Sequence, residues 1–305
     1  MNKFLKYVGS LFVLILLAVF FSGCDGMLRK EESFESSFHI TNNTDYSLLD
    51  VDSRNGSIEV IPWNENFFKI EGKKFIQGSG NLDELIEKVQ IREKEIGSVI
   101  RIYIDFPESN NFLKNTSYGA NLTISVPTDI FSSLEKIDLD SSNGPVYLSS
   151  FTGSIVADTS NSSMKFEGCT GDLKAKSTNG SISLNNVKGQ IDVTTSNASI
   201  QLNDCFLTGS SNHFQTTNGS IDGDFTPPLS GNTTFSTSNS WVTLRVPSIS
   251  NINFSARTSN GSISTENLLV KLTQDSKNSK NGMVNEGGAK IDIKSSNGNV
   301  KIIGE

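Results

Sequence analysis

Apolar and polar residues alternate along most of the chain, on both sides of an asparagine that recurs at a regular spacing. The repeated unit reads apolar, x, apolar, x, Ser/Thr, Ser/Thr, Asn, Gly, x, apolar, x, apolar. The asparagines of these units are Asn55, Asn143, Asn161, Asn179, Asn197, Asn218, Asn239, Asn260 and Asn297. They are 18 residues apart from Asn143 to Asn197 and 21 residues apart from Asn197 to Asn260. A period of 18–21 residues with two short strands per unit predicts one coil of a β-solenoid for each repeat.

Alignment of the units on their asparagines indicates which side chains face the interior. Apolar residues stand six and four positions before most of the asparagines, and three and five positions after them. The residues between them are mostly polar, and this alternation is typical of strands with one buried face. A single unit cannot bury such a face alone, so neighbouring coils are expected to stack their inward residues in columns. Each fully buried aliphatic side chain then contributes about 1.5–3 kcal/mol.

The inward pattern slips by one residue at each Asn-Gly pair, so the chain is expected to turn a corner there. Asn and Gly tolerate positive φ and are preferred in tight turns, which would explain the pair. Stacked asparagine side chains can also hydrogen-bond along their column. A second corner is expected at Gly153, Gly171 and Gly189, each ten residues after an Asn. We interpret these glycines and the asparagines as a structural turn ladder rather than a ligand site.

The regularity of the pattern divides the chain into segments. Residues 137–265 are expected to form regular coils, and residues 45–136 wider, degenerate coils. A separate N-terminal domain over 61–136 is the alternative for the less regular part, and 81–88 could form a turn or two of helix. The polar stretch 266–289 breaks the spacing and is interpreted as a surface loop, followed by a last coil at 290–305.

The first residues have the features of an export signal. Lys3 and Lys6 precede an apolar stretch, and Ser22-Gly23-Cys24 follows it. This order predicts a signal peptide over 1–23. The sequence before Cys24 resembles the lipobox of bacterial lipoproteins, although Phe21 stands where Leu is usual. The resemblance implies lipidation of Cys24 and a linker over 24–44, whereas an ordinary signal peptide and an uncleaved anchor helix are the alternatives.

Charge excludes some partners. The chain carries a net charge of −7, and the loss of residues 1–23 with Lys3 and Lys6 would make it −9. There is no Lys/Arg run after residue 23. This composition argues against nucleic acid as a partner and against electrostatic attachment to anionic lipid. The lipid on Cys24 is therefore the expected membrane contact.

The repeats resemble a known family. The segment Asp50–Val60, the strand pattern Leu122–Pro127 and the serial Ser/Thr-Asn-Gly units are similar to the bacterial putative-adhesin family of unknown function with β-strand repeats. The match covers roughly residues 45–305. The resemblance implies an all-β, right-handed, single-stranded β-helix (a β-solenoid) on the cell exterior. It supplies no catalytic residues.

No set of residues in the sequence predicts catalysis, a metal site or a cofactor. There are two histidines, His39 and His213, and the many serines lack a neighbouring base. Asp138, Asp140 and Asp158 could lie close together on adjacent coils, where like charges are unfavourable unless compensated. A bound cation is one way to compensate them. The simpler expectation is that Arg92 lies beside Asp140 and neutralises it.

Trp241 and Tyr147 are the candidate residues of a binding surface. Trp241 stands in a column that otherwise holds small residues, and an exposed indole can stack on a sugar or a partner protein. The alternative is that the 266–289 segment folds over it. Cys169 and Cys205 both stand eight residues after an Asn, so we expect two buried, free thiols separated by two coils.

The sequence therefore predicts a non-enzymatic, extracytoplasmic, lipid-anchored β-solenoid whose faces bind a glycan or a surface protein, as in an adhesin. A sensor or accessory protein in envelope stress signalling and a polysaccharide-active enzyme are the competing hypotheses. Asp25 resembles the inner-membrane retention signal of some lipoproteins. It does not decide which membrane holds the chain.

Overall fold

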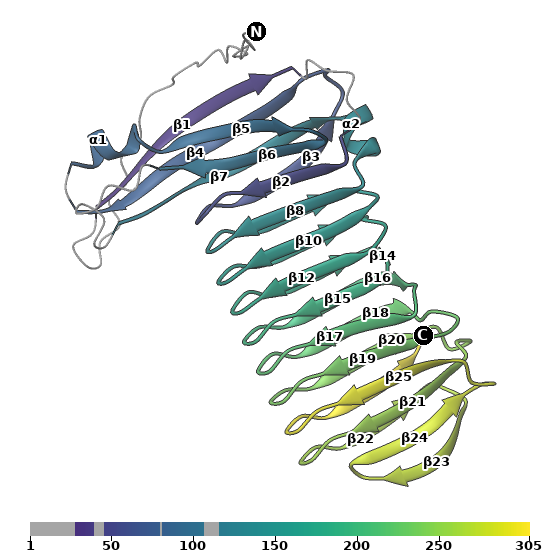
Figure 1. Ribbon diagram of the computed structural model, residues 1–305. Helices are drawn as coiled ribbons and strands as arrows, with labels where there is room; N and C mark the ends of the chain where they lie inside the picture. Colours follow the sequence, from purple (N-terminus) through teal and green to yellow (C-terminus); the bar gives the residue numbers. More distant parts are fainter. Residues whose placement is uncertain (1–27, 40–45, 80, 107–115) are drawn as a thin grey trace.

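The computed structural model describes residues 28–39, 46–79, 81–106 and 116–305, and these form a solenoid of two long sheets (Figure 1). Each regular coil contributes one strand to each sheet, and neighbouring coils pair in parallel. The all-β solenoid that the repeats predict is confirmed. Two short helices, α1 (Leu82–Ile86) and α2 (Thr128–Ser133), lie in the N-terminal half of the chain. No helix in the described ranges is long and apolar enough to span a membrane.

Sheet A carries the strands that follow each corner asparagine. Its strands in spatial order are β1 (Leu28–Phe38), β4 (Phe68–Gly78), β7 (Ser117–Pro127), β3 (Ile58–Trp63), β9 (Val146–Ser149), β11 (Met164–Glu167), β13 (Ile182–Asn185), β16 (Ile200–Leu207), β18 (Ile221–Thr226), β20 (Val242–Val246), β26 (Val300–Gly304) and β22 (Ile263–Glu266), with β14 (Lys188–Gly189) beside β16.

Sheet B carries the strands that precede each corner asparagine. Its strands in spatial order are β23 (Val270–Ser276), β24 (Ser279–Val284), β21 (Ile252–Arg257), β25 (Ala289–Lys294), β19 (Asn232–Ser236), β17 (Ser211–Gln215), β15 (Ile191–Thr194), β12 (Leu173–Ser177), β10 (Ser154–Thr159), β8 (Lys136–Ser141), β2 (Leu48–Asp52), β6 (Val99–Asp105) and β5 (Gln90–Ile96).

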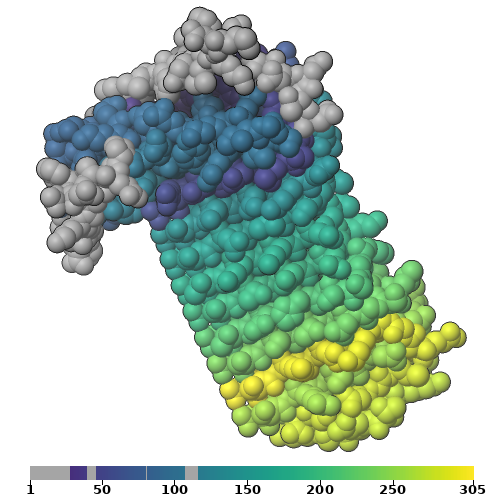
Figure 2. All heavy atoms as spheres, viewed as in Figure 1, coloured from purple at the N-terminus to yellow at the C-terminus, as the bar shows by residue number. Residues whose placement is uncertain are grey.

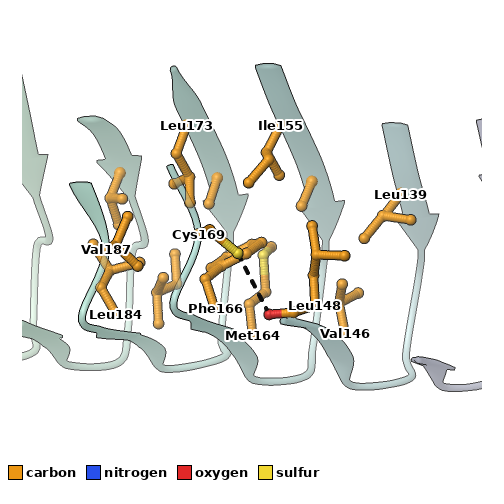
Figure 3. Packing of buried hydrophobic residues seen from close by; sticks show 14 of the residues in the cluster. Leu139, Val146, Leu148, Ile155, Met164, Phe166, Cys169, Leu173, Leu184 and Val187 are labelled. Carbon is orange, nitrogen blue, oxygen red and sulfur yellow. Dashed lines mark hydrogen bonds between the residues drawn. The ribbon is translucent and has the colours of Figure 1, made fainter. Parts of the chain in front are cut away.

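The core lies between the two sheets, and its columns match the predicted inward positions. In one coil Ile182 and Leu184 are completely buried, whereas Ser183 between them is half-exposed. Figure 3 shows the inward residues of successive coils, Val146 to Val187, packed in contact with one another. Buried apolar columns that run the length of the stack are therefore the main source of stability.

The order of the coils differs from the order of the sequence at both ends of the stack. The first coil, β2–β3, lies between β6–β7 and β8–β9. The coil nearest the C-terminus, β25–β26, lies between β19–β20 and β21–β22. Figure 2 shows these C-terminal residues in yellow between layers coloured green. The expectation that 290–305 form the last coil of the stack is therefore wrong, because this segment is inserted one coil before the end.

The N-terminal region combines two coils of the stack, β2–β3 and β6–β7, with a cap of antiparallel strands. Strand β1 lies in the segment that was predicted to be a linker, and it pairs antiparallel with β4, which pairs antiparallel with β7. Strand β5 pairs antiparallel with β6. Because β6 and β7 are parallel to β2 and β3, the cap continues both sheets of the solenoid. The alternative of a separate domain over 61–136 is thus also wrong.

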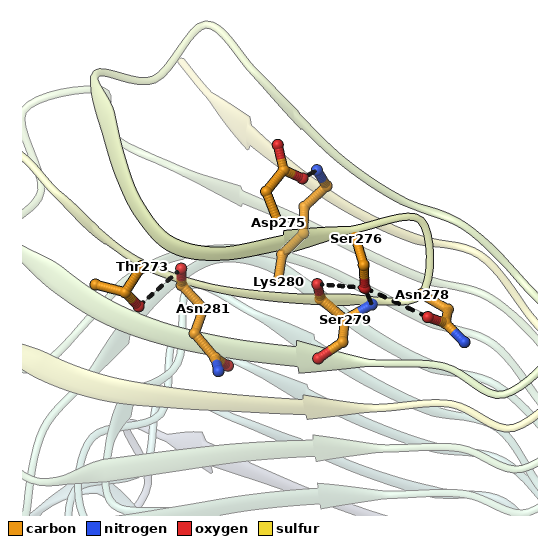
Figure 4. Close-up of polar contacts among 7 residues, drawn as sticks. All are labelled: Thr273, Asp275, Ser276, Asn278, Ser279, Lys280 and Asn281. Carbon is orange, nitrogen blue, oxygen red and sulfur yellow. Dashed lines mark hydrogen bonds and ion pairs between the residues drawn. The ribbon is translucent and has the colours of Figure 1, made fainter.

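The C-terminal end is closed by a hairpin where the sequence predicts a surface loop. Strands β23 and β24 pair with each other, and β24 extends sheet B antiparallel to β21. Polar contacts hold the hairpin together, including an ion pair between Lys280 and Asp275 (Figure 4). The many polar residues of this segment reflect its position at the exposed edge of a sheet, where charged side chains discourage pairing with other chains.

Candidate binding surface

The nine corner asparagines form one continuous ladder. Each Nδ2 donates to Oδ1 of the asparagine in the preceding coil of the stack, at 2.5–2.8 Å. At the N-terminal end, Nδ2 of Asn55 donates to the carbonyl oxygen of Tyr118 at 2.8 Å. Since both ends of nearly every amide are used within the ladder, it stabilises the corner and offers little to a ligand.

The glycines after these asparagines are explained by close packing and not by positive φ. None of the corner asparagines, nor the glycine after any of them, has positive φ, so the turn argument from the sequence is wrong at this corner. A Cβ on Gly180 would lie 1.7 Å from the carbonyl oxygen of Ser162 in the neighbouring coil. At the second corner the argument does apply, since Gly153 and Gly171 have φ of 150° and 128°.

A second ladder of hydroxyl groups lies inside this corner, and the sequence analysis missed it. Two residues before each Asn stands a Ser or Thr that is buried. In a representative coil, the hydroxyl of Thr216 accepts from the backbone N–H of Gly219 at 3.2 Å and donates to the carbonyl oxygen of Ala198 at 2.9 Å. The signal for this ladder in the sequence is the occurrence of Ser or Thr at this position in all nine units, which polar alternation alone does not require.

Trp241 lies on the outer face of sheet A near the C-terminal end. Its side chain is 56% exposed, and it borders a cavity of about 380 Å³. The 266–289 segment does not cover it, because that segment forms the hairpin that extends sheet B. The other polar residues around the cavity are Thr243, Ser262, Ser264, Glu266, Asn299 and Lys301.

The polar groups around Trp241 are partly engaged and partly available. The hydroxyl and the backbone N–H of Ser262 both donate to Oδ1 of Asn299, at 3.2 and 2.9 Å. Lys301 and Glu266 form an ion pair at 2.8 Å. Among the described residues, Nδ2 of Asn299 makes no hydrogen bond and is oriented by the contacts of its own Oδ1. The cavity therefore combines an apolar platform with amide, hydroxyl and charged groups.

Tyr147 is not part of the same site. It lies on the same sheet, but five coils away from Trp241 in the stack. Its hydroxyl donates to Glu167 at 3.4 Å, and Nζ of Lys165 lies 5.4 Å from the centre of its ring. These contacts hold the ring against the sheet, so the structure does not bring the two candidate residues together.

The aspartates of sheet B lie together as expected, but the predicted neutralising residue lies elsewhere. Asp140 is between Asp52 and Asp158 on adjacent strands. Arg92 forms an ion pair with Asp105 at 3.4 Å and not with Asp140, so that expectation is wrong. The ion pairs of the cluster join Arg101 to Asp50 at 3.3 Å, Lys136 to Asp138 at 2.8 Å and Arg54 to Asp52 at 3.9 Å.

The environment of the cluster raises the pKa of two of its carboxyl groups. Burial raises the pKa of Asp50, and the neighbouring Asp138 adds to the effect while Arg101 opposes it. Burial also raises the pKa of Asp140, and the charges of Asp52, Asp158 and Asp138 add to it. Within the described ranges, no group of three or more His, Cys, Asp or Glu side chains has the arrangement of a metal site.

The remaining candidate residues are structural or lie outside the description. Cys169 and Cys205 are buried and free, and each Sγ lies near a backbone carbonyl oxygen, at 3.7 Å from Leu148 O and 3.5 Å from Leu184 O respectively. Cys24, the predicted lipidation site, and the signal peptide over 1–23 lie outside the described residues. His213 faces outward and contacts Gln215.

Comparison with known proteins identifies the family. The family model described as Toastrack DUF4097 matches residues 86–303. Two similar solved structures are a putative adhesin from Bacteroides fragilis, at 14% identity, and a putative adhesin from Parabacteroides distasonis, at 11%. The Bacteroides fragilis structure has a TM-score of 0.37, and the match covers 92% of this chain and 98% of that one. The Parabacteroides distasonis structure has a TM-score of 0.38, and the match covers 89% of this chain and 97% of that one. Among curated proteins none matches. The match over most of its length places this chain in the Toastrack DUF4097 family.

Proposed function

We propose that this chain is a non-enzymatic surface protein that binds a glycan through the cavity beside Trp241. The observation that carries the proposal is an indole that is 56% exposed on an otherwise polar strand face. An exposed indole can stack on a ligand, and tryptophan is enriched among the residues that contribute most to binding. Sugar rings present C–H faces that stack on an aromatic ring and hydroxyl groups that hydrogen-bond to its surroundings.

The groups around the indole suit a neutral sugar. Asn299 supplies an amide donor, and Thr243 and Ser264 supply hydroxyls. The charges of Lys301 and Glu266 compensate one another, so the cavity has no excess of either sign. The site also lies on strands β20, β26 and β22, whose backbones are fixed by the stack. A binding surface on rigid strands loses little conformational entropy when a ligand binds.

The proposal includes attachment at the cell surface through Cys24. Replacement of Cys24 by Ser should leave an unlipidated precursor, which mass spectrometry and detergent partitioning would reveal. Cleavage at another position with an unmodified Cys24 would contradict this part of the proposal. The glycan site does not depend on it.

The binding test uses the full chain, purified in detergent, on a panel of neutral glycans. Trp241→Ala should weaken binding at least about tenfold, because a buried aromatic contact contributes on the order of 1–2 kcal/mol or more. Leu229→Ala is the matched control, since Leu229 is 99% exposed at a corner and is not part of the cavity. Binding that is unchanged in Trp241→Ala would refute the site, and turnover of the glycan would refute the absence of enzymatic activity.

A further inference from the structure

A second hollow lies on the opposite sheet, near the same end of the stack. It has a volume of about 510 Å³ and is bordered by β25, β21 and β24, which are neighbours in sheet B. Its polar lining consists of Asn253, Ser255, Arg257, Asn281, Lys290, Asp292 and Lys294. None of these residues belongs to the Trp241 cavity, and no aromatic side chain is exposed in it.

Two uncompensated positive charges stand side by side in this hollow. Arg257 and Lys294 lie opposite each other on the parallel strands β21 and β25, and both side chains are exposed. Within the described part of the chain, neither has a carboxylate within 4.0 Å, although the neighbouring Lys290 pairs with Asp292 at 2.8 Å. Like charges on directly opposite positions are unfavourable, so this pair lowers stability unless an anion binds between them.

The neutral groups between these charges can hydrogen-bond to a ligand. Ser255 lies opposite Asp292 on one side and opposite Asn281 on the other, and its hydroxyl makes no hydrogen bond to the described residues. The Nδ2 group of Asn281 donates to Oε1 of Gln274 at 2.6 Å. Its Oδ1 is buried and has no partner. An unpartnered buried acceptor costs free energy that a hydroxyl donor from a ligand would recover.

The positive pair lies in a chain that carries a net negative charge. The net charge is −7, and on the same sheet three aspartates near the N-terminal end form ion pairs with Arg101, Lys136 and Arg54. Lys280 of the hairpin likewise forms an ion pair with Asp275 (Figure 4). Long-range electrostatics therefore oppose the approach of an anion, and only close contact with Arg257 and Lys294 favours it.

We propose that this hollow binds the carboxylate or sulfate groups of an acidic polysaccharide. The planar guanidinium of Arg257 can donate two parallel hydrogen bonds to an oxyanion, and Lys294 adds a point charge beside it. Around that group, the hydroxyl of Ser255 would donate to or accept from a sugar hydroxyl, and Oδ1 of Asn281 would accept from one. Recognition here rests on charge and not on stacking, so the site is independent of the one beside Trp241.

The test measures binding of the full chain in detergent to immobilised polygalacturonate, dextran sulfate and neutral dextran. We expect binding to at least one of the two polyanions, weakening as salt is added, and none to dextran. A preference between the polyanions identifies carboxylate or sulfate as the recognised group. The double substitution Arg257→Gln with Lys294→Gln should weaken binding at least about tenfold, because hydrogen bonds to charged groups contribute on this order.

The control removes the same charge elsewhere on the same face. Lys174→Gln with Lys176→Gln removes two exposed positive charges on β12, outside the hollow. This variant should alter binding less than about twofold, because salt screens the long-range attraction between these lysines and the polyanion. Equal losses in the two double variants, an unaffected Arg257/Lys294 variant, or no binding to either polyanion would overturn the proposal. Trp241→Ala should leave polyanion binding unchanged, so failure of one site is distinguishable from failure of the other.

Discussion

Asn297 donates a hydrogen bond to Asn239 at 2.8 Å, although Asn260 lies between the two in the sequence. Asn260 in turn donates to Asn297 at 2.7 Å. The asparagine ladder thus records the insertion of the C-terminal coil between two coils that precede it in the chain. The inserted coil is therefore paired with a neighbouring coil on each side. The β23–β24 hairpin, and not this coil, covers the end of the stack.

The insertion can be tested with engineered disulfides on the outer face of sheet B. Ser236 is opposite Lys294 on the neighbouring strand, whereas Arg257 is one strand further away. Strands are about 4.8 Å apart, and a disulfide needs Cα atoms within about 7 Å. The pair Ser236→Cys and Lys294→Cys should therefore oxidise readily, and the pair Ser236→Cys and Arg257→Cys should not. The reverse result in non-reducing mass analysis would mean that the coils stack in sequence order.

The inward and outward columns predict opposite effects for adjacent substitutions. Ile182 is completely buried, so Ile182→Asp places an unpaired charge in the core and should reduce the free energy of unfolding by more than about 3 kcal/mol. Ser183 faces outward on the same strand, and Ser183→Asp should change the free energy of unfolding by no more than about 0.5 kcal/mol. Thermal unfolding of the two variants measures the difference, and equal losses would show that the assignment of the two faces is wrong.

The regular coils were predictable because their signal is local and repeated. Ile182 and Leu184 follow Asn179 at the same distances as in the other units, and one buried face with a period of two explains them. The order of the coils was not predictable in this way. The units of Asn260 and Asn297 present the same kind of inward residues, so either could pack on the unit of Asn239.

The caps and the binding sites depend on long-range pairing that leaves a weaker local pattern. Strand β1 begins with charged residues because it is an edge strand, and these hide its alternation. Trp241 could be chosen from the sequence because it is an exception in its column. Arg257 and Lys294 could not be chosen from the sequence. They matter because no carboxylate of the described residues lies near them, and only the pairing of β21, β24 and β25 shows this.

The raised pKa of Asp140 gives stability a dependence on pH. A carboxyl whose pKa is higher in the folded state binds more protons there, so its contribution to stability falls as pH rises through that pKa and is least unfavourable in acid. Because Asp140 is solvent-exposed and its charge is screened, Asp140→Asn should stabilise the fold at pH 7 by only a few tenths of a kcal/mol, and the gain should vanish near pH 3. Denaturant unfolding at both pH values measures this. Asp192→Asn is the control, because Asp192 is on the same sheet next to Lys174 and His213, and it should give no such gain.

The two buried cysteines provide the last prediction. Cys169 and Cys205 stand in one inward column with Val187 between them (Figure 3 shows Cys169 and Val187). Two coil spacings separate their Cα atoms by nearly 10 Å, on the basis of about 4.8 Å per coil, which is beyond the reach of a disulfide. Burial also raises the pKa of both thiols, that of Cys205 to about 11, so at pH 8 only about a thousandth of the Cys205 thiol is the reactive thiolate.

Both thiols should therefore resist alkylation in the folded protein and react fully once it is unfolded. Iodoacetamide labelling at pH 8 with and without denaturant, followed by peptide mass analysis, measures this for each cysteine separately. Raising the pH to 10 without unfolding should speed the reaction only slightly, because the surrounding coils still exclude the reagent. Rapid labelling of the native chain, or a bond between Cys169 and Cys205 in material that was never reduced, would mean that these coils are not in the register that places Val187 between them.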